Sequence, residues 1–221
     1  NDLTGPNRTA GANVGSYAYT DVSGSAFNTA VSAQPSLVIT PRDITLTSLS
    51  AATKVYDGNT VASITGGAFG NIVAGETLAF SGSGYFNSAN VTGVSTVTVN
   101  DISALTQVDG TGLWSNYNLT TTGALTSNTV ANQITAAPLT ATVNDSAIFV
   151  TQAGANAPFM GVSYSGFVGG DTAATALSGS ATLQYTGANA NPAAGVHTNV
   201  LGLSSTPTAN HGNYTITVDA G

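Results

Sequence analysis

The sequence predicts an all-β protein, and three observations support this class. Short stretches alternate apolar or β-branched residues with polar ones, as half-buried strands do. Glycine (26 of 221 residues), together with Asn and Asp, separates these stretches at intervals that suit a sandwich or a barrel. Charged residues make up only 6% of the chain, so the strong helix formers Lys, Arg and Glu are scarce. We expect tandem Ig-like β-sandwich modules in an elongated rod, with a β-grasp-like variant as the alternative.

Five stretches show the alternation most clearly. In chain order they are residues 37–40 (LVIT), 44–47 (ITLT), 96–99 (TVTV), 139–143 (LTATV) and 214–218 (YTITV). In each of them β-branched or apolar residues recur at every second position, which is the spacing of one face of a strand. Each stretch is therefore expected to bury one face and to leave the other in solvent.

The chain also contains a tandem repeat. The strand ends at Ile39 and Ile134 are 95 residues apart, and so are the acids Glu76 and Asp171 in the related stretches IVAGET and FVGGDT. Two unrelated matches at one offset indicate a genuine repeat. We therefore expect one module at residues 41–136 and a second at 137–221. Residues 1–40 are expected to be the C-terminal part of a preceding repeat, and the short proline-containing linkers favour a stiff arrangement.

Composition argues against several classes of function. The net charge is −7 with three basic residues, so the clustered Lys and Arg that bind nucleic acid or an anionic membrane surface are missing. No apolar run approaches the roughly 18–20 residues of a membrane helix, so we expect no membrane insertion. The first residues lack the features of a signal peptide and resemble the cut edge of a longer protein. The chain has no cysteine, which excludes disulfides.

The motifs of common enzymes and metal sites are also lacking. His197 and His211 lie in unrelated contexts, and the stretch GVSYSG (161–166) misses the nucleophile-elbow pattern. We expect no enzymatic activity and no cofactor. Calcium is the one cation kept as an alternative, since it takes oxygen ligands from loops, but no EF-hand pattern is present. Chelators are accordingly expected to leave the melting temperature unchanged.

The stretch TKVYDGNT (53–60) holds the only lysine of the chain. Asp57-Gly58 is a strong hairpin or turn signal, because glycine adopts positive φ at little cost. We expect Tyr56 to bury its ring in the core of its own module and to keep its hydroxyl hydrogen-bonded. Glu76 and Asp171 share one repeat position between a glycine and a threonine. We expect these carboxylates to cap a short helical turn or a tight loop.

The longer motifs resemble two known repeat families. KVYDGNTVASI (54–64), GNIVAGETLAFSGSGYF (70–86) and NYNLT (116–120) resemble the YDG repeat of bacterial filamentous-haemagglutinin-like exoproteins. PLTATV (138–143), the stretch from Ala157 to Leu183 and GNYTITV (212–218) resemble the companion MBG repeat. The second copy has IFVT (148–151) where its family usually has a YG dipeptide.

This resemblance implies a large secreted or cell-surface bacterial adhesin that uses a two-partner secretion route. Its partner in export would be an outer-membrane transporter, and the repeats would form a stalk or spacer in a protein for attachment or biofilm matrix. The alternative is a binding module for a polysaccharide, host glycan or host receptor. In that case Trp114, Tyr117 and Tyr85 would contact the sugar, since carbohydrate sites stack sugars on exposed aromatic faces.

Overall fold

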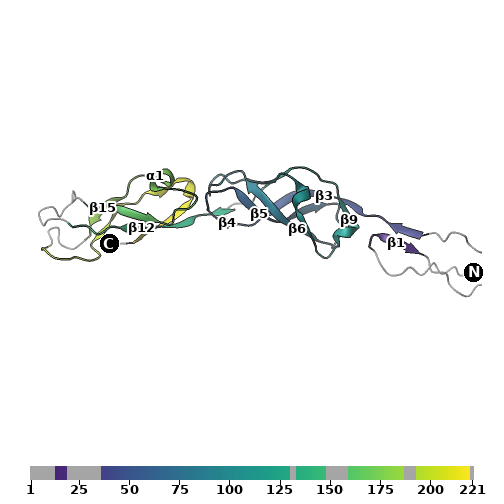
Figure 1. Cartoon of the computed structure of the whole chain (residues 1–221), viewed down its shortest axis with the longest axis horizontal. Helices are drawn as coiled ribbons and strands as arrows, with labels where there is room; N and C mark the ends of the chain where they lie inside the picture. Colours follow the sequence, from purple (N-terminus) through teal and green to yellow (C-terminus); the bar gives the residue numbers. More distant parts are fainter. Residues whose placement is uncertain (1–12, 19–35, 130–132, 148–158, 187–192, 220–221) are drawn as a thin grey trace, which may run out of the picture. The chain divides into compact units, whose positions relative to one another are not determined.

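The predicted all-β class is confirmed by a computed structural model, which describes residues 13–18, 36–129, 133–147, 159–186 and 193–219 (Figure 1). Its one α-helix in this described part is α1 (Ala173–Ala176), a single turn. Three 3₁₀ turns are described, η1 (Ile102–Ala104), η2 (Trp114–Asn116) and η4 (Asn210–Gly212). None of the described helices is long and apolar enough to cross a membrane. The IFVT stretch of the second repeat lies outside the described residues.

The largest sheet has seven strands and is mixed. Its strand order is β10 (Leu125–Asn128), β7 (Thr96–Val99), β6 (Leu78–Phe86), β5 (Val61–Gly70), β3 (Arg42–Ala51) and β9 (Tyr117–Leu119), with β8 (Thr106–Asp109) paired to β6. The expected alternation holds in β3, where Ile44 and Leu46 are buried between exposed threonines. It also holds in β7, where Val97 and Val99 are buried. Sequence periodicity therefore placed the core-facing side of these strands correctly.

The other sheets are small. A three-stranded sheet has the order β13 (Val162–Ser165), β12 (Ala137–Val143), β18 (Tyr214–Asp219). The remaining pairs are β1 (Gly15–Ala18) with β2 (Ser36–Ile39), β4 (Lys54–Val55) with β11 (Ile134–Thr135), β14 (Leu177–Ser178) with β17 (Thr208–Ala209), and β15 (Thr182–Tyr185) with β16 (Leu201–Ser205). Ig-like sandwich topology is not established by this arrangement, and it remains a prediction.

The chain divides into two compact units that are interleaved in sequence. Unit 1 holds residues 1–50, 63–83 and 99–127, and unit 2 holds residues 51–62, 84–98 and 128–221. Two stretches of the first repeat, 51–62 and 84–98, therefore belong to the same unit as the whole second repeat. The repeats defined by sequence and the units defined by packing are different divisions of the chain.

Strand register supports the equivalence of the two repeats. In unit 1, β3 and β9 are parallel with Arg42 opposite Tyr117. In unit 2, β12 and β18 are parallel with Ala137 opposite Tyr214. Arg42 and Ala137 differ by the 95 residues seen in the sequence, so each repeat opens with a strand that pairs with its own closing strand.

Each unit has its own core. In unit 1 Ile44, Leu78, Trp114 and Tyr117 form a buried cluster, and Phe69, Ile72 and Leu119 pack against it. In unit 2 the buried residues of β12 are those at alternate positions: Ala137, Leu139, Ala141 and Val143. Burial of such side chains is the main favourable contribution to folding in a chain without disulfides.

Candidate functional site: the Tyr56 clasp

The polar side chains of residues 54–61 stabilise the turn that follows Tyr56. The Asn59 N–H donates to Asp57 Oδ1 (3.1 Å), and the Val61 N–H donates to Asn59 Oδ1 (2.9 Å). Lys54 Nζ lies 2.7 Å from Asp57 Oδ1 and donates to Asn59 Oδ1 (2.9 Å). Partial burial acts to raise the pKa of Asp57, but hydrogen bonds from Lys54 and the Asn59 N–H bring that pKa below its ordinary value. Lys54 therefore organises the turn from within.

The strand before this turn pairs with the linker between the repeats. β4 runs parallel to β11, with Lys54 opposite Ile134. The Lys54 N–H donates to the Gln133 carbonyl (2.9 Å), and the Tyr56 N–H donates to the Thr135 carbonyl (2.8 Å). Asp57-Gly58 thus lies in a turn as expected, but β4 pairs with β11 rather than forming a hairpin with the next strand. These bonds direct the Tyr56 side chain toward the second repeat.

Tyr56 is buried, but not in the core that its sequence position suggested. Only 6% of the residue is exposed, and its ring meets that of Tyr214 edge-on at a centroid distance of 5.4 Å. Tyr214 in turn meets Phe167 edge-on at 5.5 Å. Such edge-to-face pairs stabilise by about 0.5–1.5 kcal/mol beyond the area they bury. The expectation that Tyr56 packs within residues 41–136 is therefore corrected, because its ring contacts residues of the second repeat.

One carboxylate oxygen accepts from both tyrosines. The Tyr56 hydroxyl donates to Asp171 Oδ2 (2.9 Å), and the Tyr214 hydroxyl donates to the same atom (2.7 Å). The Tyr214 oxygen also accepts from the Val168 N–H (3.1 Å). Hydrogen bonds to a charged acceptor are about twice as strong as neutral ones. We name Tyr56, Asp171 and Tyr214 the Tyr56 clasp.

The backbone of the turn approaches the second repeat very closely. Gly58 has φ +78°, and a Cβ atom there would lie 2.8 Å from the Cα of Gly169. Gly169 has φ +64°, and a Cβ atom there would lie 2.8 Å from the Cα of Gly58. Glycine is therefore favoured at both positions for two independent reasons, left-handed backbone and lack of space.

A second segment of the first repeat reinforces the clasp. The Val91 N–H donates to Asn213 Oδ1 (2.9 Å), and Asn213 Nδ2 donates to Asn90 Oδ1 (2.8 Å). Asn213 is only 5% exposed, and the loop at Asn90 and Val91 supplies hydrogen-bond partners for its buried side-chain amide. Sequence reasoning missed Asn213 and Tyr214 as site residues. The signal was present in the shared NY dipeptides, Asn116-Tyr117 and Asn213-Tyr214.

Unit 1 contains the same arrangement at its own NY dipeptide. The Val14 N–H donates to Asn116 Oδ1 (2.8 Å), and Asn116 Nδ2 donates to Asn13 Oδ1 (2.8 Å). The Tyr117 hydroxyl donates to Glu76 Oε2 and accepts from the Val73 N–H. Burial, followed by the bond to Glu76, raises the pKa of Tyr117. The carboxylate–tyrosine pair is therefore a repeated feature of the fold.

Residues 40–125 match the YDG domain family. No curated protein and no solved structure matches the chain. The YDG match contains Tyr56, Asp57, Gly58, Glu76 and Tyr117, so it includes the donor tyrosine of the clasp and the acid of unit 1. The acceptor Asp171 lies beyond the YDG match, in the second repeat.

The carboxylates at the shared repeat position bind tyrosines and do not cap a helix. Glu76 and Asp171 each end a turn, closed by their own N–H groups onto the carbonyls of Val73 and Val168 (3.0 Å in both). Helix α1 begins after Asp171, and there the Thr172 N–H donates to the side chain of Thr175. The predicted capping role is therefore wrong, because the turn places the carboxylate against the tyrosine hydroxyls.

Trp114 and Tyr117 do not present their rings for stacking on a sugar. Trp114 is 8% exposed, its Nε1 donates to the carbonyls of Ala79 and Val108 (2.9 Å each), and its ring meets Phe69 edge-on. Tyr117 is 7% exposed. The predicted stacking of a sugar on an exposed ring face is therefore corrected for both residues by their burial, and Trp114 instead lines the pocket described below. Tyr85, in β6, is 37% exposed and is the only one of the three with a substantial open surface.

Burial of the single tryptophan can be measured directly. We expect iodide to quench the fluorescence of Trp114 weakly in the folded protein and strongly in urea, because an ion must reach the indole to quench it. A Stern–Volmer slope in buffer equal to that of free tryptophan would contradict the core position of this ring.

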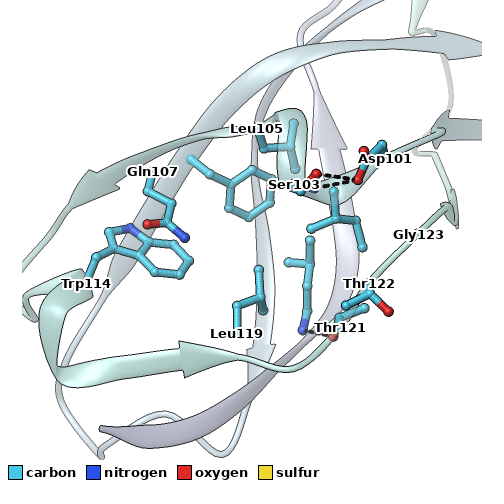
Figure 2. Close-up of a pocket in the computed structure, with 12 residues that line it drawn as sticks. Asp101, Ser103, Leu105, Gln107, Trp114, Leu119, Thr121, Thr122 and Gly123 are labelled. Carbon is cyan, nitrogen blue, oxygen red and sulfur yellow. Dashed lines mark hydrogen bonds between the residues drawn. The ribbon is translucent and has the colours of Figure 1, made fainter.

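Unit 1 also contains a pocket of about 400 Å³ beside the YDG core (Figure 2). The indole of Trp114 lies with Gln107 at one end, and Asp101 and Ser103 lie at the other. Hydrogen bonds from the Ser103 side chain and N–H lower the pKa of Asp101. The remaining lining residues are Leu46, Phe80, Ile102, Leu105, Leu119, Thr121, Thr122 and Gly123. Within the described residues, no three His, Asp or Glu side chains are grouped to hold a metal.

The Tyr56 hydroxyl makes stability depend on pH in the alkaline range. Burial, followed by the bond to Asp171 and its charge, raises the pKa of Tyr56 to about 12. A tyrosine in the unfolded chain titrates near 10, so the unfolded state loses the proton first and this contribution disappears as pH rises from about 10 to 12. We expect the free energy of unfolding in urea to fall by on the order of 2–3 kcal/mol across this range.

The control for this pH effect is Tyr56→Phe, which keeps the ring and removes the ionising group. The difference between wild type and this variant should shrink as pH rises through the same range. The raised pKa of Tyr117 acts on both proteins alike and cancels in that difference. Tyr214 donates to the same Asp171 oxygen as Tyr56, so its titration is part of the difference that is measured. Parallel curves for the two proteins from about pH 8 to 12 would contradict the raised pKa.

Proposed function

We propose that this chain is a structural spacer segment of a large secreted or cell-surface bacterial adhesin. The observation that carries the proposal is the interlocking of the repeats. Residues 51–62 and 84–98 of the first repeat lie in the same compact unit as the second repeat, and Tyr56 and Asn90 bond to its side chains. A repeat that completes its neighbour's unit suits a continuous load-carrying array better than a free-standing module.

The finer parts of this proposal come from the resemblance of the motifs. The second repeat would be of the MBG type, and the parent protein a filamentous-haemagglutinin-like exoprotein of a two-partner secretion system. An outer-membrane transporter would export it to the cell surface, where it would take part in attachment or biofilm matrix. A spacer needs no catalytic residues and no cofactor, and the tandem modules would be arranged as a rod.

Small-angle scattering tests the spacer proposal. The full chain is expected to give the pair-distance distribution of a rod, with one short cross-section peak and a long tail. A variant that removes the clasp acid, Asp171→Ala, is expected to broaden the cross-section peak, since the bonds that hold residues 51–62 within unit 2 are weakened. A compact globular distribution for the wild-type chain would overturn the proposal.

A binding module for a polysaccharide or host glycan is the second candidate, and the unit 1 pocket is the observation that favours it. The pocket combines an apolar floor with polar groups at its ends, which is the usual make-up of a small-ligand site. A glycan array with the full chain tests this candidate. Binding in the pocket would be supported if the wild-type chain binds a glycan, the Gln107→Ala variant does not, and the control variant Ser178→Ala, far along the sequence, still does.

A further inference from the structure

Unit 1 has the acceptor half of the Tyr56 clasp. Glu76 corresponds to Asp171, Tyr117 to Tyr214, and Asn116 to Asn213, with the same hydrogen bonds in each set. Asn13-Val14 bonds to Asn116 as Asn90-Val91 bonds to Asn213. The partner that unit 2 has in addition is the strand Lys54–Val55 with Tyr56, and no described residue supplies a counterpart of that strand in unit 1.

Burial differs at the place where that strand would lie. In unit 2 the linker residues beside β4 are covered, with Gln133 6% and Ile134 0% exposed. The equivalent positions in unit 1 are 95 residues earlier, where Val38 is 61% exposed and Ile39 is only partly buried. Val73, in the turn that leads to Glu76, is 38% exposed, whereas its counterpart Val168 is partly buried. β2 pairs with β1 along one edge, with Val38 opposite Ser16 and Ile39 opposite Gly15, and no described strand pairs with its other edge. Apolar residues at such an open edge are typical of a surface that is covered by a partner strand.

We propose that this surface, formed by residues 38–40 and the turn 73–76, receives the Tyr-Asp-Gly segment of another copy of the repeat. The incoming strand would run parallel to residues 38–40 and donate its amides to the carbonyls of Val38 and Thr40, as β4 does to Gln133 and Thr135. Its tyrosine hydroxyl would donate to Glu76, whose carboxylate has lone pairs for a second donor. The inference rests on the proposed tandem spacer, and it names the partner as a segment of the same type.

One residue differs between the two acceptor surfaces. Ala74 of unit 1 stands where unit 2 has Gly169, and in its turn only Gly75 has positive φ (+84°). In unit 2 both Gly169 and Gly170 have positive φ, at the point where Gly58 approaches. The Ala74→Gly variant removes this difference and is therefore expected to strengthen docking on unit 1.

The test supplies the missing segment within the full chain. A copy of residues 51–62 (AATKVYDGNTVA) is joined to residue 1 through a flexible Gly/Ser linker, which gives an effective concentration of about millimolar for a short linker. Hydrogen exchange followed by nuclear magnetic resonance reports on the amides of the added Lys and Tyr. We expect at least about tenfold slower exchange at these two amides than in the free peptide. Chemical shifts should change at residues 38–40 and 73–76.

The matched control carries Tyr56→Ala in the added copy alone, and it should exchange like the free peptide. Residues 133–135 and 168–171, which already hold the native strand, serve as the internal control and should not shift. Glu76→Gln is expected to reduce the protection, since it removes the charged acceptor. The experiment uses two linkers, of about 10 and 20 residues, which have end-to-end distances near 18 and 25 Å. If the amides of the added Lys and Tyr are unprotected with both linkers, the inference is overturned. Equal protection with the alanine copy, or shifts centred elsewhere, would also overturn it.

Failure of this docking is distinguishable from failure of the spacer proposal. The native clasp in unit 2 and the scattering of the unmodified chain do not depend on the added segment. A rod-like wild-type chain with an undocked tether would leave the spacer proposal standing and remove only the acceptor surface of unit 1.

Discussion

Replacing Tyr56 with Ala is expected to lower the free energy of unfolding by about 3–5 kcal/mol, as for other buried aromatic residues. The ring is 6% exposed and packs against Tyr214, so its removal leaves a cavity and exposes an aromatic edge. It also takes away one of the two hydroxyl donors of Asp171. A small domain is stable by only about 5–15 kcal/mol, so this loss should be visible in urea unfolding and in hydrogen exchange of the β12 amides.

Two further variants separate the contributions of the Tyr56 ring and hydroxyl. Tyr56→Phe keeps the packing and loses one hydrogen bond to a charged group, so about 1.5–3 kcal/mol is expected. Val55→Ala changes the adjacent residue of the same strand, which is 54% exposed, and should cost less than about 1 kcal/mol. Equal effects of Tyr56→Ala and Val55→Ala would show that the clasp contributes nothing to stability.

Substitution of Gly58 by Ala is the second large effect. Left-handed backbone costs a residue with a Cβ roughly 1–2 kcal/mol, and Gly58 has φ +78°. The new Cβ would in addition lie 2.8 Å from the Gly169 Cα, which is backbone and cannot rotate away. Overpacking of this kind typically costs about 1–3 kcal/mol more, so we expect a total of about 2–5 kcal/mol in urea unfolding.

The chain offers a matched control for the space around Gly58. Gly170 has φ +83° and nothing within 4 Å of an added Cβ, so Gly170→Ala measures the backbone cost alone. Gly169→Ala approaches the same contact from the other side and should resemble Gly58→Ala. Gly58→Val, with its branched Cβ, should be the most destabilising. If Gly58→Ala and Gly170→Ala melt alike, the close approach of the two turns is wrong.

The sequence was sufficient for the parts of the structure that depend on local pattern. Alternation in the stretches 44–47 and 139–143 predicted the all-β class and the core-facing side of β3 and β12, because side-chain direction in a strand has a period of two. Asp57-Gly58 predicted a turn, because positive φ is a local property of glycine. The 95-residue offset also agrees with the equivalent strand registers of the two repeats.

The roles of side chains whose partners are distant in the sequence could not be predicted from local sequence pattern. Glu76 and Asp171 were expected to cap, because the unpaired amides of a short helical turn or tight loop favour an anionic acceptor, but their turns direct them to Tyr117 and Tyr214. Trp114 was considered for a sugar site from its residue type alone, whereas Phe69 and two backbone carbonyls enclose it. Asn213 was missed because its partners, Asn90 and Val91, are more than 120 residues away.

The sequence by itself determined the all-β class, the strands at the five alternating stretches, the turn at Asp57-Gly58 and the 95-residue offset. Only the tertiary structure decided that the tyrosine of the first repeat completes the unit of the second. Its bond to Asp171 spans 115 residues. The physical reason is that strand period and turn preference arise from each residue's own backbone and neighbours. The burial site of Tyr56 depends on the pairing of β4 with β11, which lies about 80 residues further along the chain. Periodicity within either strand does not reveal which distant strand it pairs with.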